Sequence, residues 1–147
     1  MRVKDYIPEA SKRLVVVAPD VGVHELAAKL AERGIDLVVV VKDGVMRGVV
    51  TDSDIVTWAA GLEDGVTISG NAASLMSTNV FSCQPERSLA DVVKDAASRG
   101  LKHFPIVNEK GEPLGVIYVA AALIRLEKEN QLSAEWLLAY IRGAGYH

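Results

Sequence analysis

The feature that most constrains the fold of this chain is an internal duplication. Two strand-like runs that end in proline, at residues 14–19 and 80–85, each lead into a helical pattern that stops at an Arg-Gly pair. The two prolines are 66 residues apart, and the same spacing separates Gly34 from Gly100. Because a match without gaps over a strand, a helix and the next strand is difficult to obtain by chance, the two segments are predicted to be copies of one unit.

Each copy is expected to contain a strand, a helix, two further strands and a second helix. Apolar residues recur at helical spacing before Gly34 and Gly100, where a helix end needs the left-handed conformation that glycine adopts freely. The second hairpin turn is one residue longer than the first, which raises the spacing of the later elements to 67. The later strands are expected at 37–41, 45–50, 104–107 and 113–119, and the later helices at 52–60 and 120–129.

The predicted fold class is α+β, with two β-α-β-β-α repeats packed as a pseudo-twofold pair and an additional C-terminal helix. The first repeat is placed at residues 1–66, the second at 67–129 and the helical extension at 130–147. A turn-rich connection at 61–73 joins the repeats. Ser133 can cap the last helix, which either covers the core of the pair or contacts a partner chain. Its apolar stripe consists of Leu132, Trp136, Leu137, Tyr140 and Ile141.

The composition favours a cytoplasmic protein that binds neither nucleic acid nor a membrane. Half of the residues are apolar, and the net charge of −3 offers no basic surface for nucleic acid. No apolar run, including the one at 37–41, is long enough to cross a bilayer. The first residues lack the apolar stretch of a secretory signal, and Cys83 is the only cysteine, so no intrachain disulfide is possible.

Several segments resemble, in their order, the parts of a CBS domain, and the duplicated frame resembles a tandem CBS-domain pair, or Bateman module. Residues 3–7 and 73–76 resemble the helical lead-in of that family, and residues 103–107 resemble its second strand. Residues 48–55 resemble its recurring segment of glycine, hydroxyl and aspartate. The resemblance covers roughly residues 1–129.

The resemblance implies a free-standing regulatory module with a cleft between its two sheets. Such a cleft is expected to bind an adenosine-containing ligand, such as AMP, ADP, ATP or S-adenosylmethionine. The resemblance also implies a homodimer and a regulated partner protein that the sequence does not identify.

The first candidate ligand-binding residues are Thr51 and Asp54. Asp54 can accept hydrogen bonds from ribose hydroxyls, and Thr51 can donate one to a phosphate at the start of the following helix. The same Thr-x-x-Asp spacing also predicts a capping box, and the two roles can coexist. Their equivalents in the second copy are Tyr118 and Ala121, which have neither the small hydroxyl nor the carboxylate. One competent site per chain is therefore expected.

The family resemblance places strands of the second copy opposite Asp54. Lys102 and His103 can neutralise a phosphate there, or they simply lie at a solvated strand start. Their equivalents in the first copy are Asp36 and Leu37, which carry no positive charge. The other candidates for lining the site, the last two of them as apolar support for the base, are Gln84, Ser82, Cys83, Phe104 and Ile55.

The sequence gives little support for catalysis. Cys83 and the three histidines show no metal-ligand spacing, and no glycine-rich phosphate loop is present. We therefore expect no catalytic residues, no metal, no prosthetic group and no enzymatic activity. The alternative to a ligand sensor is a scaffold that binds no small ligand and acts through dimerisation or partner binding.

Overall fold

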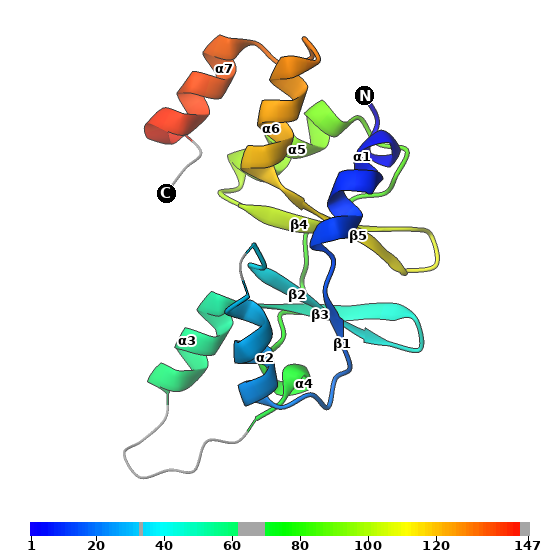
Figure 1. The fold of residues 1–147 in the computed structure, drawn as a ribbon, viewed down its shortest axis with the longest axis vertical. Coiled ribbons are helices and arrows are strands. Elements are labelled where there is room, and N and C mark those ends of the chain that lie inside the picture. Colours follow the sequence, from blue (N-terminus) through cyan, green and yellow to red (C-terminus); the bar gives the residue numbers. More distant parts are fainter. Residues whose placement is uncertain (33, 62–69, 145–147) are drawn as a thin grey trace.

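The computed structural model describes residues 1–32, 34–61 and 70–144, and Figure 1 shows two α+β units, one above the other. The elements of the first unit are β1 (Val16–Val17), α2 (Val23–Leu30), β2 (Leu37–Lys42), β3 (Val45–Thr51) and α3 (Asp52–Ala60). Those of the second are α5 (Leu89–Ser98), β4 (His103–Val107), β5 (Pro113–Tyr118) and α6 (Val119–Lys128). The lead-in helices are α1 (Val3–Ala10) and α4 (Ala72–Leu75), and the last helix is α7 (Ala134–Ala139). Short turns of other helix types cover Ser11–Arg13 and Tyr140–Ala144.

The two sheets contain the same hairpin, which confirms the predicted duplication. β2 pairs antiparallel with β3, and β4 pairs antiparallel with β5. Leu37 faces Thr51 in the first hairpin, and the equivalent residues His103 and Tyr118 face each other in the second. Both hairpins also contain a register shift at equivalent residues of β2 and β4. The repeat therefore extends to the details of strand pairing.

The strand that precedes the first helix of each repeat is the main difference between the two units. In the first unit β1 pairs parallel with β2, and the N–H of Val39 donates to the carbonyl oxygen of Val15 at 2.9 Å. In the second unit the same segment makes only an isolated bridge between Cys83 and Ile106, so the prediction of a strand there was wrong. The equivalent of Val39 is Pro105, which has no N–H to donate, and this rung of the ladder cannot form.

The lead-in helices are exchanged between the two units. Helix α1 packs on the second unit, where Val3, Tyr6 and Ala10 are buried in its core, and Figure 1 shows α1 beside β5. Helix α4 packs on the first unit, where Ala72 is buried. Each core is thus completed by a segment that precedes the other repeat. The predicted boundary between residues 66 and 67 lies outside the described residues.

A glycine in the last strand of each hairpin permits the exchanged segment to approach. A Cβ atom at Gly48 would lie 2.6 Å from the carbonyl oxygen of Ser77, which follows α4. A Cβ atom at Gly115 would lie 2.8 Å from the carbonyl carbon of Ala10, at the end of α1. Both distances are shorter than real contacts of a Cβ atom, so the two crossing points require residues without a side chain.

The C-terminal helix covers the core of the second unit. The Ser133 hydroxyl accepts a hydrogen bond from the N–H of Trp136 at 3.1 Å, which confirms the predicted cap. Leu132 and Tyr140 are buried in the second core, and the Trp136 side chain packs against it. Ile141 is the exception in the apolar stripe, because it is 60% exposed. Most of this stripe therefore serves the chain's own core.

A candidate ligand-binding cleft between the repeats

A cleft lies between the two units, beside an apolar cluster that they share. Leu37, Val39 and Val49 of the first unit pack there with Val116 of the second. The cleft has a volume of about 610 Å³, within the range of small-molecule sites. The start of β2, the end of β3 and the first turn of α3 form one wall, and residues 77–81 and 100–105 contribute the rest.

Thr51 lines the cleft, whereas Asp54 is not among the residues of its wall. One carboxylate oxygen of Asp54, Oδ2, accepts hydrogen bonds from the backbone N–H of Thr51 at 2.8 Å and from its hydroxyl at 3.2 Å. This is the capping-box arrangement that the sequence also allowed. The Asp54 carboxylate therefore orients Thr51 at the point where β3 passes into α3.

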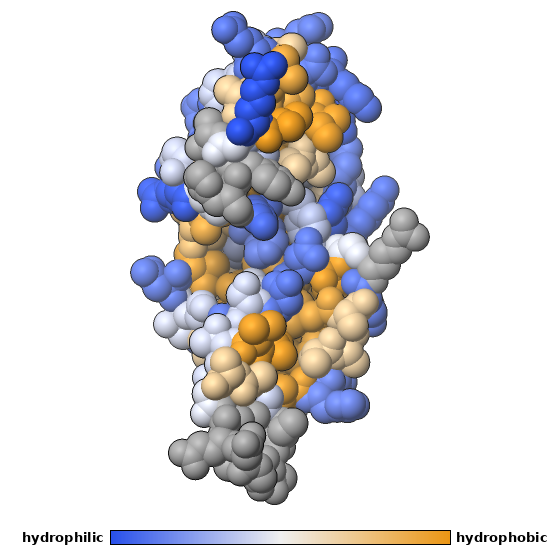
Figure 2. All heavy atoms as spheres, turned by 90° about the vertical axis from the view of Figure 1, so that its left-hand side faces the viewer, coloured by the Kyte–Doolittle hydropathy of each residue, from blue (hydrophilic) through white to orange (hydrophobic). Residues whose placement is uncertain are grey.

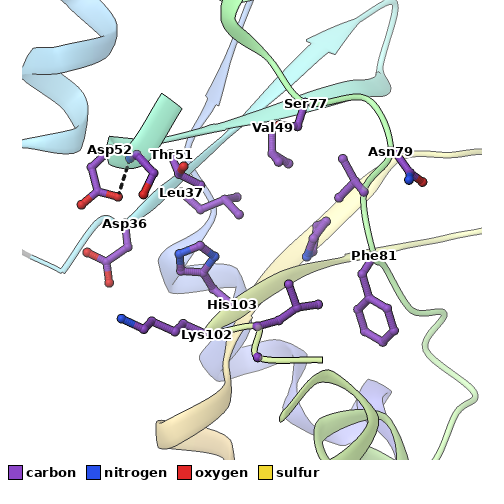
Figure 3. Close-up of a pocket in the computed structure, with 15 residues that line it drawn as sticks. Asp36, Leu37, Val49, Thr51, Asp52, Ser77, Asn79, Phe81, Lys102 and His103 are labelled. Carbon is purple, nitrogen blue, oxygen red and sulfur yellow. Dashed lines mark hydrogen bonds between the residues drawn. The ribbon is translucent and has the colours of Figure 1, made fainter. Parts of the chain in front are cut away.

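The basic pair of the second unit faces acidic residues of the first. Lys102 and His103 lie at the start of β4 and line the cleft together with Asp36 and Asp52 (Figure 3). Burial lowers the pKa of the His103 imidazole, although the nearby carboxylates of Asp36 and Asp52 act in the opposite direction. The ring of His103 lies 5.9 Å from that of Tyr118. At neutral pH His103 is therefore an uncharged imidazole that can both donate and accept a hydrogen bond.

Three of the predicted site residues pack in the hydrophobic cores and do not line the cleft. Cys83 and Phe104 are 4% and 1% exposed in the second core, and burial raises the pKa of the Cys83 thiol to about 12. Ile55 packs against the first core. Side chains alternate along a strand, so His103 and Pro105 point into the cleft while Phe104 points away from it.

The remaining two candidates lie near the cleft but not in its wall. Gln84 is exposed, on the segment that follows Cys83. Ser82 lines a hollow that adjoins the cleft and shares Phe81 and Asn79 with it. Of the predicted site residues, the structure thus brings Thr51, Lys102 and His103 together in one cleft.

The sequence analysis missed several residues of the cleft, among them Asp36, Asp52, Asn79 and Phe81. The 66-residue spacing contained a signal for one of them, because Asp36 is the equivalent of Lys102. In a pseudo-twofold pair, equivalent strand ends meet close to the axis, so both residues border the same cleft. Phe81 contributes a phenyl ring to the cleft wall. This ring contacts that of Phe104 edge to face, with 5.2 Å between the ring centroids.

The equivalent space on the other side of the pair is occupied by Tyr118. This residue takes the place of Thr51, and its hydroxyl donates to the carbonyl oxygen of Gly34 at 2.8 Å. The same hydroxyl accepts a hydrogen bond from the N–H of Asp36 at 2.8 Å. The guanidinium of Arg13 stacks on the tyrosine ring, 4.0 Å from its centroid. A large side chain thus fills the position at which the smaller Thr51 borders the open cleft.

Within the described ranges, no group of three His, Cys, Asp or Glu side chains is arranged to hold a metal ion. Among the helices that the structure describes, none combines the length and the apolar character needed to cross a membrane.

The duplicated hairpin, the exchanged lead-in segments and the intervening cleft define a tandem pair of small α+β domains. The family model described as the CBS domain matches residues 3–61 and 72–128. The chain therefore belongs to the CBS-domain family, which confirms the resemblance seen in its sequence.

Comparisons with individual proteins agree with this assignment. The CBS domain-containing protein YhcV of Bacillus subtilis is 29% identical over 125 residues, which cover 84% of this chain and 82% of that protein. The CBS domain pair of protein MJ0100, solved in complex with 5′-methylthioadenosine and S-adenosyl-L-methionine, has a TM-score of 0.71 at 19% identity, covering 88% of this chain and 98% of that one. CBSX2 in complex with AMP has a TM-score of 0.69 at 20% identity, covering 86% and 98%. These two structures share the fold of this chain.

Proposed function

We propose that this chain is a regulatory module that binds an adenosine-containing small molecule in the cleft between its repeats. The observation that carries the proposal is that both repeats supply polar side chains to one cavity of about 610 Å³. A ligand held by both walls changes the contacts between the repeats, and differential binding to two arrangements is what a sensor requires. The complexes of MJ0100 and CBSX2 support this class of ligand.

The polar groups have separate roles in this proposal. Thr51 offers its hydroxyl, and Lys102 and His103 face it from the second unit. Asp54 does not line the cleft, and its role in this proposal is to hold Thr51 in position through the two hydrogen bonds that Oδ2 accepts. Phe81 and the apolar side chains beside it provide the surface on which a base can rest. Because Tyr118 fills the equivalent space, the proposal assigns one ligand to each chain.

Calorimetric titration with adenosine, AMP, ADP, ATP and S-adenosylmethionine tests the proposal. At least one of these is expected to bind, and Thr51→Val or Asp54→Ala is expected to weaken binding by about tenfold, the equivalent of one or two lost hydrogen bonds. Thr57→Val is the matched control, since Thr57 is exposed on α3 and does not line the cleft. Absence of binding by all five compounds, or unchanged affinity in both site variants, would contradict the proposal.

A scaffold that contacts a second copy of the chain is the other candidate function. Ala120, Ile124, Leu137, Tyr140 and Ile141 line an apolar groove of about 340 Å³ between α6 and the C-terminal segment. Ile124 is 48% exposed, and Figure 2, which views this side of the molecule, shows apolar areas toward both ends. Such patches favour protein contacts.

Measurement of the mass in solution tests this candidate. We expect a homodimer that Ile124→Glu or Ile141→Glu converts to monomers, whereas Val16→Lys, at an exposed valine of β1, leaves the mass unchanged. A wild-type monomer at all concentrations would contradict the scaffold function and leave the ligand proposal intact.

A further inference from the structure

The charges that border the cleft are predominantly negative. Asp36, at the start of β2, and Asp52, in the first turn of α3, line the cavity together with Lys102. Figure 3 shows Asp36, Asp52 and Lys102 at one end of the cavity, and Phe81 and Asn79 at the other. One oxygen of Asp52 accepts a hydrogen bond from the N–H of Ser53 at 2.9 Å, and this bond leaves its negative charge in place.

His103 adds no positive charge to the cleft at neutral pH. Its ring lies between the two walls, and burial favours the uncharged form of the imidazole, so its pKa is below the ordinary value. Asp36 and Asp52 favour the charged form, and Lys102 opposes it. Two carboxylates therefore face one ammonium group across the cavity.

The next cation along the cleft is already paired. Arg99 lines the adjoining hollow with Ser82, and its guanidinium Nε lies 3.1 Å from a carboxylate oxygen of Asp95. The guanidinium also lies 5.0 Å from the centroid of the Phe81 ring. Its positive charge is thus offset by Asp95 before any ligand enters.

We infer that the cleft selects adenosyl ligands that carry little negative charge, such as a nucleoside or an adenosyl sulfonium, over nucleoside triphosphates. The inference rests on the proposed function. A triphosphate would bring several negative charges into a cavity whose wall holds Asp36 and Asp52, and like charges repel one another. A sulfonium or ammonium group would instead be attracted by the same two carboxylates.

Calorimetric titration of the whole chain with adenosine, S-adenosylmethionine and ATP, at one ionic strength and without divalent cations, tests the inference. Adenosine and S-adenosylmethionine are expected to bind at least about tenfold more tightly than ATP. The double variant Asp36→Asn/Asp52→Asn is expected to bind ATP about tenfold more tightly and S-adenosylmethionine more weakly, with adenosine changed less than about twofold. The control is Asp43→Asn, which makes the same type of substitution and removes one negative charge in the β2–β3 turn, where φ is 55° and asparagine is tolerated.

The outcomes separate the inference from the proposal on which it rests. Tightest binding by ATP in the wild type, or a double variant that leaves the ATP affinity unchanged, would overturn the inference while the proposed function stands. A gain in ATP binding free energy in Asp43→Asn of half that in the double variant or more would also overturn it, because the effect would then follow net charge, of which the control removes half. Binding by none of the three compounds would overturn the proposed function, and the inference with it.

Discussion

The hydroxyl of Tyr118 lies 2.8 Å from the carbonyl oxygen of Gly34, and this hydrogen bond joins the second repeat directly to the first. The backbone N–H of Asp36, a residue of the cleft wall, donates to the same hydroxyl. The ring of Tyr118 also approaches that of His103. Tyr118 therefore fills one side of the pair and supports the wall of the open cleft on the other.

Tyr118→Phe removes the hydroxyl and keeps the ring. The variant is expected to lose about 1 kcal/mol of unfolding free energy, because the backbone groups of Gly34 and Asp36 then depend on water for a partner. Urea unfolding followed by circular dichroism measures this loss. An unchanged midpoint would show that the bond between the repeats contributes nothing to stability.

Tyr118→Thr combined with Arg13→Asn gives the second side of the pair the residues that occupy the equivalent positions in the first, Thr51 and Asn79. This double variant is expected to open a second cavity and to raise the calorimetric stoichiometry toward about two ligands per chain. Arg13→Asn alone should leave it at one, because the tyrosine ring still fills the space. A double variant that folds and still binds one ligand would contradict the expectation.

Gly48→Ala and Gly115→Ala place a Cβ atom where the exchanged segments cross. Each is expected to cost about 1–3 kcal/mol of unfolding free energy, since the obstruction is backbone that cannot move aside. Gly22→Ala is the matched control, because nothing lies within 4 Å of a Cβ atom there. Guanidinium unfolding of the three variants measures the difference. Equal stabilities would show that the crossing points are not tightly packed.

The stability of the fold should depend on the protonation of His103. Its pKa in the folded chain lies below the ordinary value of 6.5, so the unfolded chain binds the proton more tightly. The free energy of unfolding is therefore expected to rise with pH between the lowered pKa and about 6.5, and to level off above it. Unfolding by urea at several pH values measures this dependence.

His103→Gln should remove that part of the pH dependence, while His24→Gln, at an exposed position on α2, should preserve it. An unaltered pH profile in His103→Gln would mean that other groups cause the dependence.

Much of the fold could be predicted from the sequence because its signals are local and occur twice. Helix α3 covers Asp52–Ala60, as predicted, since its start and end depend on Thr51 and Gly61 beside it. The lost strand of the second repeat was harder to foresee. Its formation depends on the partner strand β4, where Pro105 has no N–H to donate. The apolar pattern of residues 80–85 does not indicate which residue of the partner strand lies opposite.

The candidate site was predictable only in part, for a related reason. Apolar and polar residues indicate which face of an element is buried, but not which other element covers that face. Thr51, Lys102 and His103 were predicted from the family resemblance, with support from the comparison of the two copies, and the structure brings them to one cleft. Phe104 was misplaced because its neighbour His103 already occupies the cleft-facing side of β4.

The exchange of α1 and α4 has a consequence for how such a chain can be divided. A fragment that begins after α1 would lack part of the second core, and one that ends before α4 would lack part of the first. Each half therefore lacks a helix of its own core and carries the lead-in helix that completes the core of the other half. Two separate single-repeat chains could satisfy the same requirement by association, so a symmetric dimer of one repeat would be a physically sound ancestor for this duplicated protein.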